Sequence, residues 1–531
     1  MHKRVAVAFF GIMAVFGLLV VNLALIVIDT EISPSSQSTN TRSTVLSTSR
    51  GMIYDCNMKR LVNNSSRYIT VCLPTTDALN SVIGYVTQDE KNQIYENMTQ
   101  GKVSLLTTDK IFDETHLKSI EITDRYSYNQ PCVHLIGHLD ENGDGATGLE
   151  RAYNSYLSQQ SGQLKALWGV DALGHVLYGD GITTKSNGYL SPAGIQLTID
   201  LEIQQITEAV LDEFEIGKGA AVVMDSETAE ILACASVPEF NPLDLSTALE
   251  NEESPFINRA TTPYSVGSVF KPFAATAAIE NNINFVHNCT GSIEVNGTVF
   301  KCSNSTAHGT VNITSAMEQS CNTYFIALGQ KTGSEKLLSL CADFGLGKEA
   351  ELADNMYLKP GKLPTAESIT SPQALANLCF GQGELLISPV QMAAAYCVFA
   401  NGGYYRPPTL MKGIVDKNGE IIQRVQLPEA CRIISEGTAE RLDKILESVV
   451  TNGNAKRAYS EFAKCHGKTA TAQSGWYENG EEINHTWFCG YFILNNKKYV
   501  AVIFKEDGIS GSVDCAPVFK ELAERVVEKL S

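Results

Sequence analysis

The sequence predicts an α+β fold in which an antiparallel sheet is flanked by helices and has a helical lobe beside it. Two pairs of apolar runs, each joined by a polar turn, predict strands near both ends of residues 188–531. The stretch between them is mostly helical in its periodicity, which indicates one sheet interrupted by a helical insertion. A mixed α/β domain and one membrane-spanning helix are expected before this region.

Length and composition allow two or three domains, at about 100 to 200 residues each. The chain has 531 residues, of which 44% are hydrophobic and 19% charged, so enough surface can be buried to offset the chain entropy. The 59 acidic and 41 basic side chains give a net charge of −18. Because binding to nucleic acid needs a dense basic face, this charge argues against a nucleic-acid partner.

The N-terminus predicts a membrane anchor. Residues 5–28 are an uninterrupted uncharged run, long enough to span a hydrocarbon core of about 30 Å. The run is longer than the apolar part of a cleaved signal peptide, which is about 7 to 15 residues, and it does not end in an A-x-A-like cleavage site. Lys3 and Arg4 precede it, whereas Asp29 and Glu31 follow it. The positive-inside rule therefore predicts a single-pass protein whose N-terminus is cytoplasmic and whose body is extracytoplasmic.

Differences in composition predict further segments along the chain. Residues 1–4 form the expected cytoplasmic end, and residues 29–49 are rich in Ser and Thr, which predicts a flexible tether. Residues 50–187 mix short strand-like runs with turn residues, and nothing catalytic is visible in them. Residues 188–531 are expected to carry the chemistry.

Local patterns place the elements of this last region. Asp200 is the expected N-cap of a helix, and an apolar face follows it at Ile203, Ile206, Val210 and Phe214. The first hairpin is predicted over residues 219–236, and the second is predicted to turn at Asn495 and Asn496. A helix is expected to end the chain, with one apolar face formed by Phe519, Leu522, Val526 and Leu530.

The 14 cysteines are scattered from Cys56 to Cys515 without a C-x-x-C motif. This spacing predicts neither a zinc site nor a thioredoxin-type redox pair, and no metal is expected. Cys289 and Cys302 lie in one compact segment where a hairpin could bring their thiols together. Two reduced, buried thiols and a disulfide both fit this segment.

A nucleophilic serine is indicated by the segment PYSVGSVFKPF. Ser268 and Lys271 are three residues apart, so on a helix they share a face and the amine can reach the hydroxyl. Pro272 is tolerated only in a first turn, so the helix is expected to begin near Ser268. The serine N–H is then free to stabilise an oxyanion at the positive end of the helix dipole. Taken alone, the motif fits an ordinary helix start with an exposed lysine equally well.

Two further motifs follow in order. Ser320 and Asn322 form S-x-N in SAMEQSCNTYF, and Lys468, Thr469 and Thr471 form K-T-x-T in CHGKTATAQSG. The order S-x-x-K, S-x-N, K-T-x-T is that of serine enzymes that interact with penicillin. Each motif alone is a weak signal, whereas the three motifs in this order are specific for this class of enzyme.

On these motifs the chain resembles a class B penicillin-binding protein, a membrane-anchored peptidoglycan D,D-transpeptidase of the penicillin-binding protein 2, cell-division or sporulation type. Stretches typical of that family run along nearly the whole chain: RGMIYDCN, GLERAYNSYL, LTID, NRATTPYSVGSVFKPF, HGTVNITSAMEQSCNTYF, FGQGELLISPVQMAAAYCVFANGG and GKTATAQ. The resemblance implies a β-lactamase-like, penicillin-recognising transpeptidase domain over 188–531. It also implies an N-terminal pedestal or dimerisation-like domain over 50–187.

The third motif departs from the family, which usually has Lys-Thr-Gly where this chain has Ala470. A literal Lys331-Thr332-Gly333 also occurs, but its surroundings predict one helix that ends at Gly333 and another that begins there. The motif belongs on the strand beside the nucleophile, so Lys468 is interpreted as its lysine.

The resemblance implies a catalytic role for five residues. Ser268 attacks the penultimate D-alanine carbonyl of a stem pentapeptide, and Lys271 is the general base. Ser320 relays a proton to the leaving nitrogen, while Lys468 sets the electrostatics. Asn322 hydrogen-bonds the substrate amide.

Substrate binding is implied for the third motif. Lys468 attracts the terminal carboxylate, which Thr469 and Thr471 bind through their hydroxyl groups. The backbone N–H groups of Ser268 and Thr471 form the oxyanion hole. An amine of a neighbouring stem then takes the acyl group, and a β-lactam traps Ser268 by mimicking D-Ala-D-Ala.

The implied partners are peptidoglycan stem peptides, β-lactams, the bacterial cell membrane and a separate membrane glycan polymerase, since no glycan-polymerising motif follows the tether. No cofactor is expected. A β-lactamase is disfavoured by the anchor and the long segment before the nucleophile. A non-catalytic β-lactam sensor or cell-wall scaffold that kept the fold remains the alternative, with Ala470 as its only hint.

Overall fold

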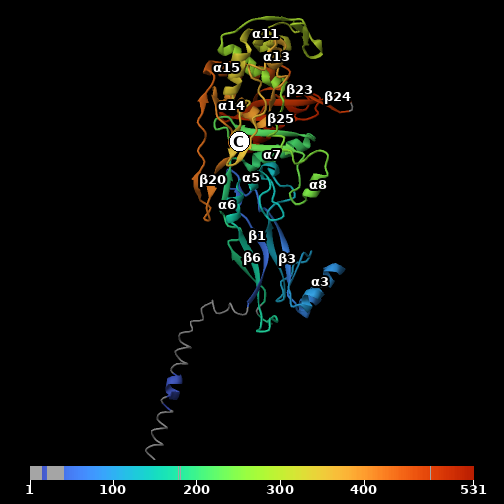
Figure 1. Ribbon diagram of the computed structural model, residues 1–531, viewed down its shortest axis with the longest axis vertical. Helices are drawn as coiled ribbons and strands as arrows, with labels where there is room; N and C mark the ends of the chain where they lie inside the picture. Colours follow the sequence, from blue (N-terminus) through green and yellow to red (C-terminus); the bar gives the residue numbers. More distant parts are fainter. Residues whose placement is uncertain (1–12, 14, 21–40, 178, 180, 479) are drawn as a thin grey trace, which may run out of the picture. The chain divides into compact units, whose positions relative to one another are not determined.

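The computed structural model describes residues 13, 15–20, 41–177, 179, 181–478 and 480–531 (Figure 1). The expected cytoplasmic end, most of the expected anchor at residues 5–28 and residues 29–40 of the expected tether lie outside the described residues. The rest of the expected tether, residues 41–49, forms a strand and is not a flexible linker. Residues 15–20 are helical, and their side chains are exposed. Within the described ranges, no helix is both long and apolar enough to cross a membrane.

The chain forms two compact units, and each takes up several separate segments. The smaller unit consists of residues 1–48, 66–123 and 162–189, and the larger consists of residues 49–65, 124–161 and 190–531. The chain therefore passes repeatedly from one unit to the other. The last passage lies between Tyr189 and Leu190, and the division of the chain at residue 188 stays a prediction.

The smaller unit contains two three-stranded sheets with the orders β1-β6-β7 and β4-β3-β5. Their strands are β1 (Thr41–Ser49), β3 (Ser65–Cys72), β4 (Ser104–Leu106), β5 (Leu117–Asp124), β6 (Gly162–Gly169) and β7 (Thr183–Asn187), and the helices are α2 (Thr76–Val82) and α3 (Gln88–Thr99). Apolar residues of both sheets, among them Leu46, Val71, Ile122 and Trp168, share one buried cluster. Alternation along the strands directs these side chains to that cluster.

The larger unit contains a five-stranded antiparallel sheet with the order β10-β9-β25-β24-β23. Its strands are β9 (Gly219–Asp225), β10 (Ile231–Val237), β23 (Lys464–Glu478), β24 (Glu481–Leu494) and β25 (Lys497–Lys505). Both predicted hairpins are confirmed, and the second turns at Asn495 and Asn496, whose φ angles are +50° and +65°. Strand β23 lies at the edge of the sheet.

Helices cover both faces of this sheet. The predicted C-terminal helix is α16 (Cys515–Leu530), and its Phe519 ring lies 4.3 Å from that of Phe488 on β24. Helix α7 (Leu201–Glu213) packs beside α16 and is capped by Asp200 as predicted. Trp487 projects to the opposite face because neighbouring strand residues alternate. Helix α14 (Pro389–Ala400), which is buried along its whole length, also packs on the sheet.

A predominantly helical lobe separates β10 from β23 in the sequence, as predicted (Figure 1). Its helices are α9 (Lys271–Glu280), α10 (Ile313–Glu318), α11 (Asn322–Thr332), α12 (Ser334–Asp343), α13 (Pro372–Cys379) and α15 (Glu436–Thr451). Short strands extend it: β12 (His287–Cys289), β13 (Ser292–Val295), β14 (Thr298–Lys301), β15 (Gly309–Val311), β16 (Ala350–Ala353) and β17 (Met356–Leu358). The α+β fold with helices on an antiparallel sheet is thus confirmed.

A mixed four-stranded sheet has the order β2-β8-β20-β21 and was not predicted from the sequence. Strand β2 (Met52–Tyr54) pairs in parallel with β8 (Gly194–Leu197), and β8 pairs with β20 (Met411–Val415), which pairs with β21 (Ile421–Arg424). The remaining elements are α4 (Val133–Ile136), α5 (Gly148–Ala152), α6 (Asn154–Gln159), α8 (Leu245–Leu249), β11 (Tyr264–Ser265), η2 (Gly267–Phe270), η3 (Ser303–Ser305), β18 (Leu386–Ile387), β19 (Tyr404–Tyr405), β22 (Cys431–Arg432) and η4 (Lys456–Ala458).

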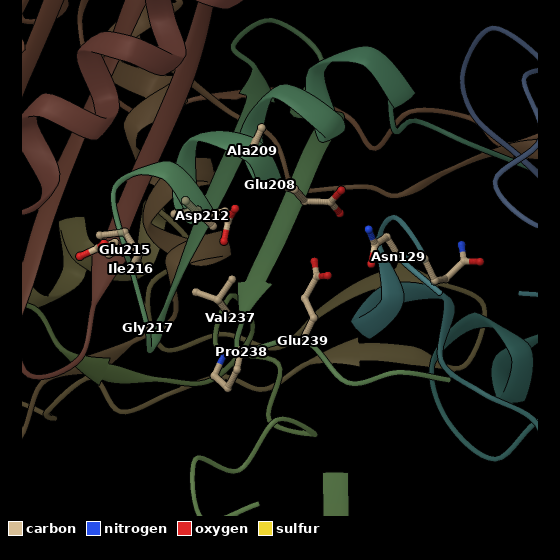
Figure 2. A pocket seen from close by; sticks show the side chains of 12 residues that line it. Asn129, Glu208, Ala209, Asp212, Glu215, Ile216, Gly217, Val237, Pro238 and Glu239 are labelled. Atoms are coloured by element: carbon tan, nitrogen blue, oxygen red, sulfur yellow. The ribbon is translucent and has the colours of Figure 1, made fainter. Parts of the chain in front are cut away.

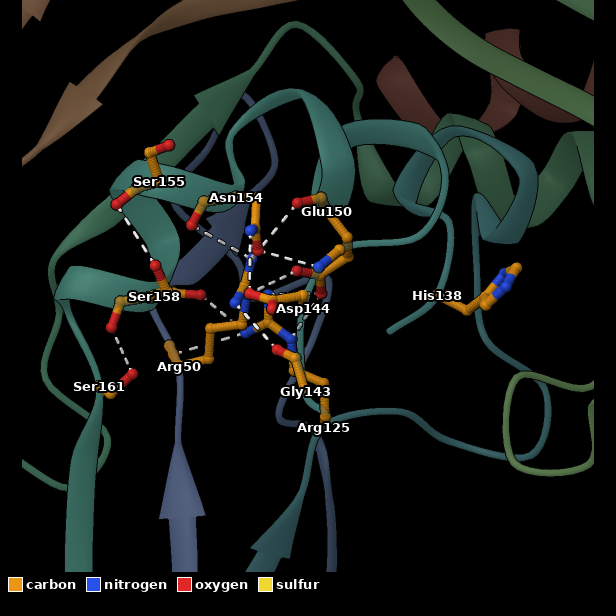
Figure 3. Close-up of polar contacts among 12 residues, drawn as sticks. Arg50, Arg125, His138, Gly143, Asp144, Glu150, Asn154, Ser155, Ser158 and Ser161 are labelled. Atoms are coloured by element: carbon orange, nitrogen blue, oxygen red, sulfur yellow. Dashed lines mark hydrogen bonds and ion pairs between the residues drawn. The ribbon is translucent and has the colours of Figure 1, made fainter. Parts of the chain in front are cut away.

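A buried ion cluster joins two of the early segments of the larger unit (Figure 3). Glu150 is fully buried and accepts hydrogen bonds from Arg50 Nε at 2.9 Å and Arg125 Nε at 2.7 Å. Arg50 also donates to the side chain of Asn154 at 2.6 Å. Two cations that share one buried carboxylate depend on it for charge compensation.

Candidate active site

Ser268 lies on η2, the 3-10 turn that leads directly into α9. Pro272 lies in the first turn of α9, so the predicted helix start near Ser268 is confirmed. The turn lies close to edge strand β23. At Gly267, whose φ is +60°, an added Cβ would come within 3.1 Å of the Thr471 carbonyl oxygen.

The FGQG segment supports this turn, a role that was not predicted from the sequence. The Gly267 N–H donates to the carbonyl of Gly381 at 2.9 Å. Gly381 has a φ of +82°, and a Cβ there would overlap the backbone of Gly267. The signal in the sequence was the glycine pair itself, since an approach this close between two backbones requires glycine.

Ser320 lies in the turn between α10 and α11. The Ser320 N–H donates to Met317 O, and the Cys321 N–H donates to Ala316 O, which is the hydrogen-bond pattern of a Schellman motif. The position that glycine usually takes in this motif is occupied by Ser320, with a φ of +53°. A non-glycine residue held in this conformation at a site is strained, and such strain clusters at functional positions.

The Ser320 hydroxyl joins the three motifs. Its Oγ is hydrogen-bonded to Ser268 Oγ at 3.1 Å, to Lys271 Nζ at 2.9 Å and to Lys468 Nζ at 3.1 Å. Asn322 belongs to the same group, because its Oδ1 accepts from Lys271 Nζ at 2.8 Å. The structure therefore brings together all five residues predicted to be catalytic.

Lys271 is fully buried, and burial lowers the pKa of its amine to about 7. Its Nζ contacts two oxygens that can only accept, Ser320 O at 2.7 Å and Asn322 Oδ1 at 2.8 Å. A neutral amine has two hydrogens and one lone pair. When both hydrogens go to these acceptors, the lone pair faces the Ser320 hydroxyl, as a general base requires.

Lys468 lies on β23, opposite Cys489 on β24, and is fully buried. Burial and the nearby Lys271 amine hold the pKa of Lys468 well below its ordinary value. Its Nζ donates to Ser320 Oγ and to Thr469 O. Because both amines are hydrogen-bonded to the same hydroxyl, a positive charge on one disfavours protonation of the other. The site therefore favours a state with at most one charged amine.

The two predicted substrate-binding threonines are arranged differently. The Thr469 side chain is buried and contacts Asn454 Oδ1 at 3.4 Å, away from Lys468 because side chains alternate along a strand. Thr471 is exposed and lies beside Gly267 on the nucleophile turn. Ala470 is 3% exposed, so its methyl group is directed into the protein.

The literal Lys-Thr-Gly lies elsewhere in the fold. Helix α11 ends at Thr332, Gly333 adopts a φ of +85°, and α12 begins at Ser334, as predicted. Lys331 is exposed, and its Nζ lies 5.2 Å from the centre of the Phe285 ring. Lys468 therefore holds the strand position that the third motif requires.

The larger unit also has a separate acidic cavity of about 580 Å³, lined by residues of α7 and the segment after β10. Figure 2 shows the carboxylates of Glu208, Asp212 and Glu239 directed into it. Partial removal from water, together with the charges of Glu208 and Asp212, raises the pKa of Glu239 to about 8. None of the predicted catalytic or substrate-binding residues lines this cavity.

Relatives of known sequence resemble most of this chain. Stage V sporulation protein D of Bacillus subtilis (strain 168) is 28% identical over 462 residues, which cover 80% of this chain and 69% of the relative. Peptidoglycan D,D-transpeptidase MrdA of Haemophilus influenzae is 24% identical over 608 residues, which cover 98% of this chain and 91% of the relative.

Solved structures share the fold. Penicillin binding protein 3 from Mycobacterium tuberculosis, complexed with aztreonam, has a TM-score of 0.66 at 22% identity and covers 92% of this chain and 97% of its own. A peptidoglycan synthase complex has a TM-score of 0.68 at 24% identity and covers 98% and 97%. The family described as penicillin binding protein transpeptidase domain matches residues 219–524, which include the nucleophile turn, the Ser320 turn and β23. The chain therefore belongs to the penicillin-binding protein transpeptidase family.

Proposed function

We propose that this protein is a peptidoglycan D,D-transpeptidase that cross-links stem peptides through an acyl-enzyme on Ser268. The observation that carries the proposal is the Ser320 hydroxyl, which is within 3.1 Å of the Ser268 hydroxyl and of both buried amines. A serine becomes a nucleophile when a base can take its proton, and this arrangement supplies one.

Acylation transfers one proton through Ser320. Ser268 Oγ attacks the carbonyl carbon of the penultimate D-alanine, while its proton passes to Ser320 Oγ and the Ser320 proton passes to the Lys271 lone pair. The backbone N–H groups of Ser268 and Thr471 stabilise the oxyanion. As the C–N bond breaks, the proton returns through Ser320 to the leaving nitrogen, and terminal D-alanine departs.

Cross-linking reverses the proton transfers of acylation. An amine of a second stem attacks the ester carbonyl and forms a new amide, and its proton passes back to Ser268. Lys271 and Ser320 carry this proton as they carried the first. A β-lactam reaches the ester stage by opening its ring, which leaves an adduct on Ser268.

Binding of the donor's terminal carboxylate is assigned to the outer side of β23. Thr471 is exposed beside the nucleophile turn and offers a hydroxyl, and Lys468 supplies positive charge when an anion is bound. Thr469 contributes its hydroxyl after leaving Asn454. Asn322 retains one N–H of its amide for the substrate, since Nδ2 has two hydrogens and one donates to Lys301 O at 2.9 Å.

The cellular setting follows from the N-terminus and from the relatives. The apolar run at residues 5–28 supports a single-pass anchor in the bacterial cell membrane, with the catalytic unit outside. One solved structure of similar fold is a synthase complex that coordinates polymerization and crosslinking. We propose that a separate membrane glycan polymerase supplies this transpeptidase with strands.

A fluorescent penicillin tests the proposal. The full chain should form a covalent adduct that mass spectrometry places on Ser268, and Ser268→Ala should abolish it. Lys468→Ala should slow acylation by a factor of about 10² to 10³, since loss of one group aimed at the developing anion costs about 3 to 4 kcal/mol.

The matched control is Lys331→Ala, which removes the lysine of the literal Lys-Thr-Gly sequence and should leave the rate nearly unchanged. An adduct on another residue, or equal losses in the two lysine variants, would overturn the assignment.

A further inference from the structure

Four side chains from separate segments meet beside the Ser320 turn. Cys289 ends β12, Cys302 follows β14, His308 precedes β15, and Cys321 caps the start of α11. The three sulfur atoms and one ring nitrogen all lie within 4.8 Å of one another. The three thiols are free and at most 3% exposed, whereas His308 is half-buried.

Three of the six distances between these atoms match the edges of a metal-centred tetrahedron. The Sγ atoms of Cys289 and Cys302 are 3.7 Å apart, and those of Cys302 and Cys321 are 3.9 Å apart. Cys289 Sγ and His308 Nδ1 are 3.4 Å apart. Bonds of about 2.3 Å to sulfur and 2.0 to 2.1 Å to nitrogen in a tetrahedral zinc site separate two sulfurs by about 3.8 Å and sulfur from nitrogen by about 3.6 Å.

Neighbouring groups are placed to support thiolate charge. The Gly291 N–H donates to Cys289 Sγ at 3.4 Å. The Thr323 hydroxyl lies 3.3 Å from Cys321 Sγ and can donate its one hydrogen to that sulfur. Donors of this kind around the ligands orient them and tune a metal site.

A disulfide accounts for the cluster less well. It would join two sulfurs at about 2.05 Å, and it would leave the third thiol and the imidazole without a role. Three soft thiolates with one imidazole form a closed four-coordinate set, which is typical of structural zinc.

We propose that Cys289, Cys302, His308 and Cys321 bind one Zn²⁺ ion that fixes the Ser320 turn. On binding, the three thiols release three protons to the solvent, neutral His308 coordinates through Nδ1, and no electrons are transferred. The ion links strands β12 to β15 to Cys321, whose neighbours Ser320 and Asn322 both contact Lys271. This effect on the turn rests on the proposed function, whereas metal binding itself does not.

The first test measures metal in the full chain, purified in detergent with a reductant and without chelator. Elemental analysis should give about one zinc per chain. Exchange for Co²⁺ should give the intense visible bands of a tetrahedral cobalt thiolate. Less than about 0.1 equivalent of zinc together with a weak octahedral cobalt spectrum would overturn the proposal, as would a disulfide between any two of these cysteines in the fresh protein. These measurements use the unmodified chain and so do not depend on a variant that folds.

Variants then locate the site. Cys289→Ser and His308→Ala should each lower zinc affinity at least about a hundredfold, measured by competition with a chromophoric chelator. Cys341→Ser is the matched control, because Cys341 is also a fully buried free thiol but lies on α12 outside the cluster. Unchanged affinity in the cluster variants would place the metal elsewhere and overturn the assignment.

The effect on the turn has its own readout. Removal of zinc should slow penicillin acylation at least tenfold, and zinc added back should restore the rate. Ser268→Ala should keep its zinc while it loses the adduct, so that failure of the metal site and failure of the proposed function give different results. An unchanged acylation rate in metal-free protein would overturn the role in the turn.

Discussion

Ser320 holds a left-handed backbone conformation that glycine adopts at lower cost. We expect Ser320→Gly to raise the free energy of unfolding by about 1 kcal/mol relative to Ser320→Ala, because both variants lose the hydroxyl and only glycine relieves the backbone. Both should acylate far more slowly than the unmodified chain. Chemical denaturation and penicillin labelling measure the two effects. A glycine variant that is less stable than the alanine variant would contradict the interpretation that the Ser320 backbone is strained.

The pH dependence of acylation reports the buried amine of Lys271. Burial lowers its pKa to about 7, and only the neutral amine can accept a proton. The titratable groups around it are Lys468 and the thiols of Cys302 and Cys321. The second-order acylation rate of metal-free protein should therefore rise with pH to about 7 and level off above it. A rate that continues to rise towards pH 10 would indicate an ordinary lysine.

At this scale the sequence predicted which residues form the site but not how they connect. Motif order identified Ser268, Lys271, Ser320 and Lys468 correctly as neighbours. Helical spacing suggested a direct contact between Lys271 and Ser268, whereas Lys271 Nζ is hydrogen-bonded to Ser320 and Asn322 in the structure. Of the cysteine cluster, the sequence brought together only Cys289 and Cys302, because His308 and Cys321 come from two other segments and no spacing typical of a metal site joins the four residues.

Helix α5 carries Glu150, whose carboxylate compensates the positive charges of two arginines. Glu150→Gln should lower the free energy of unfolding by about 3 kcal/mol or more, because Arg50 and Arg125 lose their shared buried partner. Glu202→Gln is the control, since Glu202 pairs with Lys59 at the surface, where solvent screens the pair, and should change stability much less than Glu150→Gln. Urea titration compares the two variants. Equal changes would mean that the buried cluster contributes no more than a surface pair.

Local patterns predicted the elements of the catalytic sheet well. Asp200 caps α7, the turn at Asn495 and Asn496 joins β24 to β25, and Gly333 separates two helices. Each of these depends on residues adjacent in the sequence. The parallel pairing of β2 with β8 could not be predicted, because Met52–Tyr54 is too short for a periodic signal and its partner lies far along the chain.

The whole molecule depends on segments that precede the predicted transpeptidase boundary. A fragment of residues 188–531 should be less stable than residues 41–531 by several kcal/mol. It lacks β2 and core side chains such as Ile53, Leu149 and Leu157, each worth about 1.5 to 3 kcal/mol when buried. Thermal unfolding and light scattering of the two fragments measure the difference. Equal stability would show that the early segments are dispensable.

The strand order of the four-stranded sheet also determines when this sheet can form during synthesis of the chain. Strand β2 leaves the ribosome first, its neighbour β8 follows, and β20 arrives only about 360 residues after β2. At about 5 to 20 residues per second, β20 emerges roughly 20 to 70 s after β2. During that interval the edge of the growing sheet is open to wrong partners. A chain built in this order has reason to depend on a chaperone until residue 415 has emerged.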